Sequence, residues 1–159
     1  MEIQQLLQQG YRYALSLTHN PAFAEDLLHD AWVSILSISA PQNTGYLYKT
    51  IRNKFLNHRK HEKVVPFVNL DEAFSEDELI DSETHFSQVL ADQQLIERKM
   101  GELKPLEREV IYLYYYEEYT TTEIAELVGH SKGVVCSLIY RTRIKLKQLI
   151  ESEISQVAL

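Results

Sequence analysis

The fold of this chain is decided by one stretch, which runs from Thr120 to Arg143 and reads TTTEIAELVGHSKGVVCSLIYRTR. Apolar residues recur at three- and four-residue steps on both sides of Gly129, which is typical of two short amphipathic helices joined by a tight turn. Thr120 and Glu123 have the spacing of a capping box that opens the first helix, and Ser131 can cap the second. The pattern predicts a helix-turn-helix, whose second helix can enter the major groove of DNA.

A basic segment at the end of this stretch favours DNA binding over an ordinary helical hairpin, which the apolar pattern alone would allow equally well. No acidic residue interrupts the cations, which are Arg141, Arg143, Lys145 and Lys147. Such a run is expected to bind phosphate.

Composition predicts an all-α protein. Of 159 residues, 45% are hydrophobic, while only five are glycine and four are proline, a balance that favours helices over a β-sandwich or barrel. The single cysteine, Cys136, excludes an internal disulfide and favours a reducing, cytoplasmic location. We find neither a signal peptide nor an apolar run of the roughly 20 residues that span a bilayer.

The net charge of −7 is unevenly distributed along the chain. Residues 1–63 hold seven Lys/Arg against five Asp/Glu, residues 64–100 hold two against nine, and residues 101–159 hold seven against nine. The acidity is therefore concentrated in the middle segment. Local basic patches, rather than total charge, decide phosphate contact, so the balance does not exclude nucleic acid.

The chain divides into two helical blocks. The first block is predicted to form helices over residues 3–17, 21–35 and 46–63, with a loop over residues 37–45. Asn20 is the predicted N-cap of the second helix, with proline at its first position.

An acidic segment after residue 64 is the predicted linker between the blocks, because it has few apolar residues to offset its clustered charge. Apolar spacing then predicts helices over residues 86–103 and 106–118, ahead of the helix-turn-helix, whose second helix is predicted over residues 132–153.

Two charged faces in the first block allow a functional and a structural interpretation. Polar and aromatic side chains of the third helix could bind phosphate, read base edges or stack on bases; they are Tyr46, Tyr48, Lys49, Arg52, Asn53, Asn57 and Lys60. A solvated basic face explains them equally well. The second helix carries Glu25, Asp26 and Asp30, which could bind a partner, although the helix dipole alone explains the first two.

Catalytic chemistry is not predicted. The chain has no phosphate-binding glycine loop, no nucleophile motif and no CxxC pair, so neither a cofactor nor a small-molecule substrate is expected. Of six histidines, only His58 and His61 share a helical face, and their cationic surroundings disfavour a metal ion.

Two separated blocks together resemble the extracytoplasmic-function (ECF) family of RNA polymerase sigma factors. Residues 13–18, 22–32 and 46–53 resemble the first conserved domain of the family, and residues 103–110 and 123–129 resemble the second. The blocks occur in the family's order, with an acidic segment of suitable length between them.

The resemblance implies a transcription initiation factor with two small helical domains. Residues 1–64 would bind the clamp of the polymerase β′ subunit and the −10 promoter element, residues 65–84 would form the acidic linker, and residues 85–159 would bind the −35 element. The implied partners are core RNA polymerase, through its β′ clamp and β flap, promoter DNA and an anti-sigma factor. The chain itself would insert into no membrane.

The resemblance also implies three sets of contact residues. The polymerase-binding set is Glu25, Asp26, Leu28, His29, Asp30 and Trp32. The −10 set is Tyr46, Tyr48, Lys49, Arg52, Asn53, Asn57 and Lys60. The −35 set is Ser131, Lys132, Val134, Ser137, Tyr140, Arg141 and Arg143.

The sequence departs from the family in the recognition helix. Cys136 and Leu138 stand where the family usually has DNA-facing cations, which predicts weaker phosphate binding with less salt dependence. An exposed Leu138 could instead serve a protein contact. Two alternatives therefore stay open beside the sigma factor: a helix-turn-helix regulator that binds duplex DNA without polymerase, and a sigma-like module that sequesters a partner.

Overall fold

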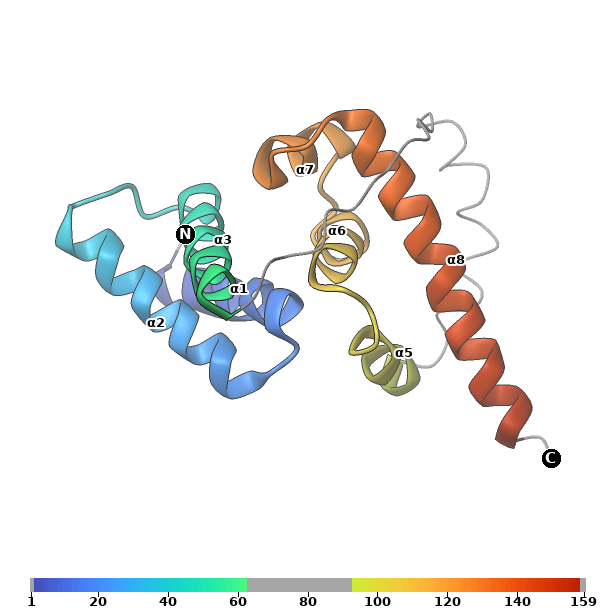
Figure 1. The fold of residues 1–159 in the computed structure, drawn as a ribbon. Coiled ribbons are helices and arrows are strands. Elements are labelled where there is room, and N and C mark those ends of the chain that lie inside the picture. Colours follow the sequence, from blue (N-terminus) through green and yellow to red (C-terminus); the bar gives the residue numbers. More distant parts are fainter. Residues whose placement is uncertain (1, 63–92, 158–159) are drawn as a thin grey trace. The chain divides into compact units, whose positions relative to one another are not determined.

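The computed structural model describes residues 2–62 and 93–157, and every regular element within these ranges is a helix (Figure 1). The predicted all-α class is therefore confirmed. The chain divides into two compact units, Met1–Val68 and Asn69–Leu159. The linker predicted over residues 65–84, and the start of the helix predicted from residue 86, lie outside the described residues.

Unit 1 is a bundle of three helices, α1 (Ile3–Thr18), α2 (Pro21–Ser37) and α3 (Thr44–Glu62), each of which contacts the other two. The apolar stripes of the three sequences meet in a common core. Its fully or almost fully buried members include Leu6, Tyr13, Leu17, Leu27, Ile35, Leu47, Tyr48 and Ile51. The polar face of each helix is left outside, and the faces of α2 and α3 carry most of the predicted contact residues of this unit.

The predicted start of α2 is confirmed in detail. The Asn20 side chain accepts a hydrogen bond from the backbone N–H of Phe23 at 3.1 Å, and Pro21 occupies the first turn, where its missing N–H is not needed. The Thr18 side chain is joined to Asn20 by hydrogen bonds in both directions across the turn. The turn between α1 and α2 is therefore fixed by local side chains.

Gly10 lets the three helices of unit 1 approach closely. A Cβ at this position would lie 2.7 Å from Leu47 Cδ2 and 2.8 Å from Leu28 Cδ1. We expect Gly10→Val to destabilise unit 1 by about 1–3 kcal/mol, because the added carbons overpack a filled interface. Urea unfolding followed by fluorescence of Trp32, the only tryptophan, measures this unit alone.

Gly45→Ala is the matched control for Gly10→Val. A Cβ at Gly45 would meet its nearest neighbour, Asn43 Oδ1, at 3.6 Å, which is ordinary van der Waals contact. Because alanine also favours helix, we expect the midpoint of urea unfolding to stay or to rise. Equal loss of stability in both variants would show that close packing at Gly10 is unimportant.

Unit 2 has four described helices: α5 (Gln93–Met100), α6 (Pro105–Tyr115), α7 (Thr121–Val128) and α8 (Lys132–Val157). The long α8 contacts the other three, and Figure 1 shows it crossing α6 steeply. The apolar face of α8 includes Val135, Ile139, Leu146 and Ile150, all of which are buried.

The predicted signals of the helix-turn-helix are all present. Thr120 Oγ1 accepts from the N–H of Glu123 at 3.1 Å, and the Glu123 carboxylate accepts from the N–H of Thr120 at 3.0 Å. Gly129 ends α7 with a φ of 73°, a conformation that a side chain would strain. Ser131 Oγ accepts from the N–H of Val134 at 3.2 Å and caps α8. The capping prediction from residues 120–131 is therefore confirmed.

Candidate protein and nucleic-acid interfaces

The polymerase-binding set lies along α2. Glu25, Asp26, His29 and Asp30 are exposed, whereas Leu28 and Trp32 are half-buried. The opposite face of α2, with Ala24, Leu27 and Ala31, packs into the core. A helix with this division offers carboxylates and an aromatic ring together to a partner, so these residues can act on one surface without disturbing the fold.

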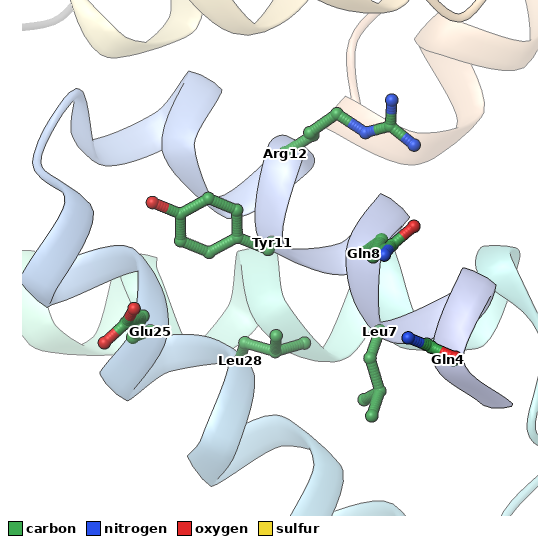
Figure 2. A pocket seen from close by; sticks show the side chains of 7 residues that line it. All are labelled: Gln4, Leu7, Gln8, Tyr11, Arg12, Glu25 and Leu28. Atoms are coloured by element: carbon green, nitrogen blue, oxygen red, sulfur yellow. The ribbon is translucent and has the colours of Figure 1, made fainter.

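Figure 2 shows that a hollow lies between α1 and α2, where Leu7 and Leu28 approach each other from opposite helices. Tyr11 and Glu25 stand at one end, and Arg12 points away from the floor. A second hollow shares Leu7, Glu25 and Leu28 with the first and adds Asp26, His29 and Trp32. The α1 residues of this surface were not predicted. In the sequence they fit the ordinary pattern of an amphipathic helix, and nothing in that pattern marks them as a site.

The −10 set forms a continuous face on α3, with one exception. Tyr46, Lys49, Asn53, Asn57 and Lys60 are exposed and Arg52 is half-buried. Successive steps of three and four residues place the exposed members on one side of the helix. The face therefore combines an aromatic ring, two amides and two cations.

Tyr48 is the exception, and its predicted role in base stacking is wrong. Its side chain is fully buried and stacks on Tyr13, with ring centroids 4.3 Å apart and an interplanar angle of 10°. Tyr46 and Tyr48 are two residues apart, so they project from different faces of a helix. Only Tyr46, which is 38% exposed, can meet a base in this conformation.

The −35 set is divided between exposed and buried positions on α8 and at its start. Ser131 and Lys132 are exposed, and Val134, Tyr140 and Arg141 are half-buried. Ser137 and Arg143 are 0% and 3% exposed. The prediction that these last two read or bind DNA is wrong for this conformation, because a side chain without accessible surface cannot reach a phosphate.

The departure at Cys136 and Leu138 also has a structural outcome. Cys136 is 1% exposed and Leu138 is 4% exposed. The prediction of an exposed Leu138 that serves a protein contact is therefore wrong. Cys136 is buried as a free thiol.

Cations of the basic segment, for which a phosphate-binding face is predicted, make contacts inside unit 2. Arg143 Nη1 donates to the Tyr115 hydroxyl at 2.8 Å. Lys145 Nζ lies 3.0 Å from Glu107 Oε1, and Lys147 Nζ lies 3.9 Å from Glu151 Oε1. Arg143, Lys145 and Lys147 thus have partners inside unit 2, which compete with any contact to DNA.

Two further groups of polar residues hold α5 in place. Buried Arg108 donates through Nη1 to the carbonyls of Met100 at 3.2 Å and Leu103 at 3.0 Å, which fixes the turn between α5 and α6. Glu153 of α8 accepts from Arg98 at 3.0 Å and lies 3.4 Å from Lys99. Sequence reasoning missed the contact between Arg98 and Glu153, because the two residues are 55 positions apart in the chain.

The far end of α6 carries an exposed aromatic ring. Tyr116 is 57% exposed and stacks on Tyr112, whose hydroxyl donates to Glu117 at 2.7 Å. Partial burial raises the pKa of Tyr116, and the nearby Glu97 carboxylate raises it further. The helix ends here, three residues earlier than predicted, and Glu118 in the following turn has a φ of 56°.

Within the described residues, no group of three or more His, Cys, Asp or Glu side chains could hold a metal ion. Among the described helices, none has the length and apolar character needed to cross a bilayer.

Comparisons with known sequences agree with this geometry. The family described as Sigma-70 region 2 matches residues 3–64, and Sigma-70 region 4 matches residues 100–148. The RNA polymerase sigma-E factor of Streptomyces antibioticus is 30% identical over 146 residues, which cover 86% of this chain and 75% of that protein. This chain belongs to the ECF family of RNA polymerase sigma factors.

Further relatives of this sigma factor span nearly its whole length. The ECF RNA polymerase sigma factor SigM of Bacillus subtilis is 28% identical over 153 residues, which cover 92% of this chain and 91% of that protein. A crystal structure of the sigma factor RpoE in complex with the anti-sigma factor NepR, from Bartonella quintana, has a similar fold. It covers 94% of each chain with a TM-score of 0.66 at 19% identity.

The two matched regions divide the candidate sites of the sigma factor. Region 2 contains all of α1, α2 and α3, and thus the acidic face of α2 and the mixed face of α3. Region 4 begins at the end of α5 and includes the helix-turn-helix and most of α8. The family consists of transcription regulators rather than enzymes, in agreement with the missing catalytic motifs.

Proposed function

We propose that this sigma factor binds core RNA polymerase in the cytoplasm and directs it to promoters by contacts to the −10 and −35 elements. The observation that carries the proposal is the placement of two chemically different faces on one three-helix unit. The acidic face of α2 suits a basic protein surface, whereas the mixed face of α3 suits DNA.

In this proposal α2 docks on the β′ clamp. Glu25, Asp26, His29 and Asp30 supply exposed polar contacts, and the half-buried Trp32 supplies apolar area. An aromatic ring beside charged groups is a frequent composition of strong contact sites between proteins. Region 4 would dock on the β flap, so that both promoter elements are reached by one holoenzyme.

The α3 face is proposed to capture the melted strand of the −10 element. Unstacked bases expose rings and edges, which Tyr46 can stack on and Asn53 and Asn57 can hydrogen-bond. Lys49 and Lys60 lie on the same face and would bind the backbone phosphates.

The −35 contact is proposed to come from the exposed and half-buried residues at the start of α8. They are Ser131, Lys132, Val134, Tyr140 and Arg141. Tethering regions 2 and 4 to polymerase raises their effective concentration at the promoter, so neither region need bind tightly alone.

An anti-sigma factor is a further proposed partner. The support is a related protein: the sigma factor RpoE of Bartonella quintana was crystallised with the anti-sigma factor NepR. Because docking requires the α2 face, a protein that covers this face would keep the sigma factor from polymerase.

Run-off transcription tests the proposed function. Core RNA polymerase is incubated with genomic promoter fragments, with and without this protein. We expect discrete transcripts only when the protein is present. If no fragment is transcribed, the proposal fails; if the protein alone binds an operator tightly and added core enzyme changes nothing, a stand-alone helix-turn-helix regulator is the better description.

A further inference from the structure

The basic segment of α8 is attached to both ends of α6. Arg143 donates to the hydroxyl of Tyr115, the last residue of α6, and Lys145 bonds to Glu107 in the first turn of α6. We call these four residues, Tyr115, Glu107, Arg143 and Lys145, the helix frame. All four bring polar groups to the junction of α6 and α8. Directional bonds there restrain the orientation of α8 on α6 more than apolar packing alone would.

Arg143 is an internal residue of region 4. Its side chain and backbone together are 3% exposed, and its Nη1 lies 2.8 Å from the Tyr115 hydroxyl. Tyr115 is itself held by the edge-on ring of Tyr114, with centroids 4.9 Å apart. A buried guanidinium whose partner is fixed in this way has a defined position, and it cannot turn outward to a phosphate without breaking this hydrogen bond.

Glu107 fixes Lys145 in the same manner at the other end. Its Oε1 accepts from the backbone N–H of Lys104 at 2.8 Å, which caps α6, and from Lys145 Nζ at 3.0 Å. The Glu107 side chain is 16% exposed, so its carboxylate is partly shielded from water. Because the N-terminus of α6 already orients the carboxylate, Lys145 meets a preformed acceptor.

The geometry of the frame restrains α8 in two ways. Arg143 and Lys145 are two residues apart, so they project about 200° apart around the α8 axis, and rotation in either direction breaks one bond. Their partners are eight residues apart on α6, or about 12 Å, whereas the two cations are about 3 Å apart along α8. The two bonds therefore start close together on α8 and end far apart on α6. This arrangement opposes a change in the steep crossing of the two helices seen in Figure 1.

We infer that Arg143 and Lys145 are positioning residues, which set the angle at which the recognition segment of α8 meets DNA, and that they do not bind DNA phosphate. The inference rests on the proposed −35 contact. Residues 132–141 belong to the same continuous helix, so any rotation at the frame moves Lys132 and Arg141 with it. Region 4 would then hold the −35 element with few cations, as the uncharged Cys136 and Leu138 already suggest.

Salt dependence separates positioning from phosphate binding. Holoenzyme binding to a promoter fragment chosen by run-off transcription is measured over a range of salt concentrations, for wild type, Arg143→Met, Tyr115→Phe and Lys132→Met. Loss of one phosphate contact lowers the slope of log K against log salt by about 0.9. We expect Lys132→Met to do so, whereas Arg143→Met and Tyr115→Phe weaken binding about tenfold with an unchanged slope.

The two partners should also be coupled. The double variant Arg143→Met/Tyr115→Phe is expected to bind no more weakly than Arg143→Met alone, since each change breaks the same bond. Lys145→Met should weaken binding in the same way, whereas Glu107→Gln should weaken it less, because the glutamine oxygen can still accept from the Lys104 N–H and from Lys145. On a fragment with a scrambled −35 segment, all these variants should bind like wild type. Unfolding of the variants would instead weaken binding to this fragment as well.

Two results would overturn the inference: a slope reduced by Arg143→Met as much as by Lys132→Met, or a Tyr115→Phe variant that binds like wild type while Arg143→Met does not. Tyr115→Phe removes only a hydroxyl, so it remains informative even if Arg143→Met unfolds region 4. Wild-type holoenzyme that uses no promoter would instead refute the proposed function, and the two failures are thus distinguishable.

Discussion

Asp26→Arg is expected to abolish binding of this sigma factor to core RNA polymerase while region 2 stays folded. Asp26 is exposed on α2 and lines the hollow that also contains His29 and Trp32. A basic partner surface would then face an arginine, and like charges across an interface cost several kcal/mol, so affinity should fall by roughly 100-fold or more. Fluorescence anisotropy of labelled protein titrated with core enzyme measures the loss.

Glu151→Arg is the matched control for Asp26→Arg, because it makes the same change in net charge, but in unit 2. Glu151 is exposed, and its ion pair with Lys147, at 3.9 Å, is of the surface kind that contributes little. We expect this variant to bind core enzyme like wild type. A similar loss in both variants would mean that total charge, rather than the α2 face, determines docking. Unchanged helical circular dichroism in both variants establishes that the fold is intact.

Tyr46→Ala is expected to reduce open-complex formation without reducing binding to core enzyme. Stacking of one base on an aromatic side chain contributes about 1–3 kcal/mol, so the fraction of melted promoter should fall about tenfold. Permanganate reactivity of thymines in the −10 element measures this fraction directly. The effect should appear in the melting step, because the exposed ring of Tyr46 would contact a base only after the strands separate.

Tyr48→Phe is the control that the structure selects for this prediction. Tyr48 is fully buried, and its hydroxyl lies at the long distance of 3.5 Å from the Gln9 carbonyl. Phenylalanine keeps the stacking on Tyr13, so we expect permanganate reactivity to equal that of wild type. If Tyr48→Phe and Tyr46→Ala reduced melting alike, the proposal that only the exposed tyrosine acts in promoter melting would be wrong.

The features that were predictable from sequence are local. The helix ends depend on residues within a few positions of one another, so their spacing in the sequence is enough to predict them. They are Asn20 with Pro21, Thr120 with Glu123, and Gly129. The family resemblance rested on such blocks as well, and the matches over residues 3–64 and 100–148 support it independently. The acidic face of α2 was equally predictable from the sequence, since charged residues opposite an apolar stripe must lie outside.

The features that were not predictable depend on which surfaces meet in space. Ser137 and Ile139 are two residues apart and therefore project in nearly opposite directions, yet both are fully buried. Periodicity assigns one buried face to a helix, and so it placed Ser137 on the outside. Arg143 and Lys145 were interpreted as phosphate ligands for a related reason: their partners Tyr115 and Glu107 lie 28 and 38 residues away.

The helix frame has a consequence for how promoter preference can change during evolution. The side chains that orient α8 are separate from the exposed ones, Ser131 and Lys132, that stand at its start. Substitution at an exposed position can alter the preferred sequence while α6 continues to hold the helix at the same angle. A lineage can thus acquire new target genes by single changes at exposed positions, whereas loss of Arg143 would weaken the −35 contact whether or not Tyr115 also changed.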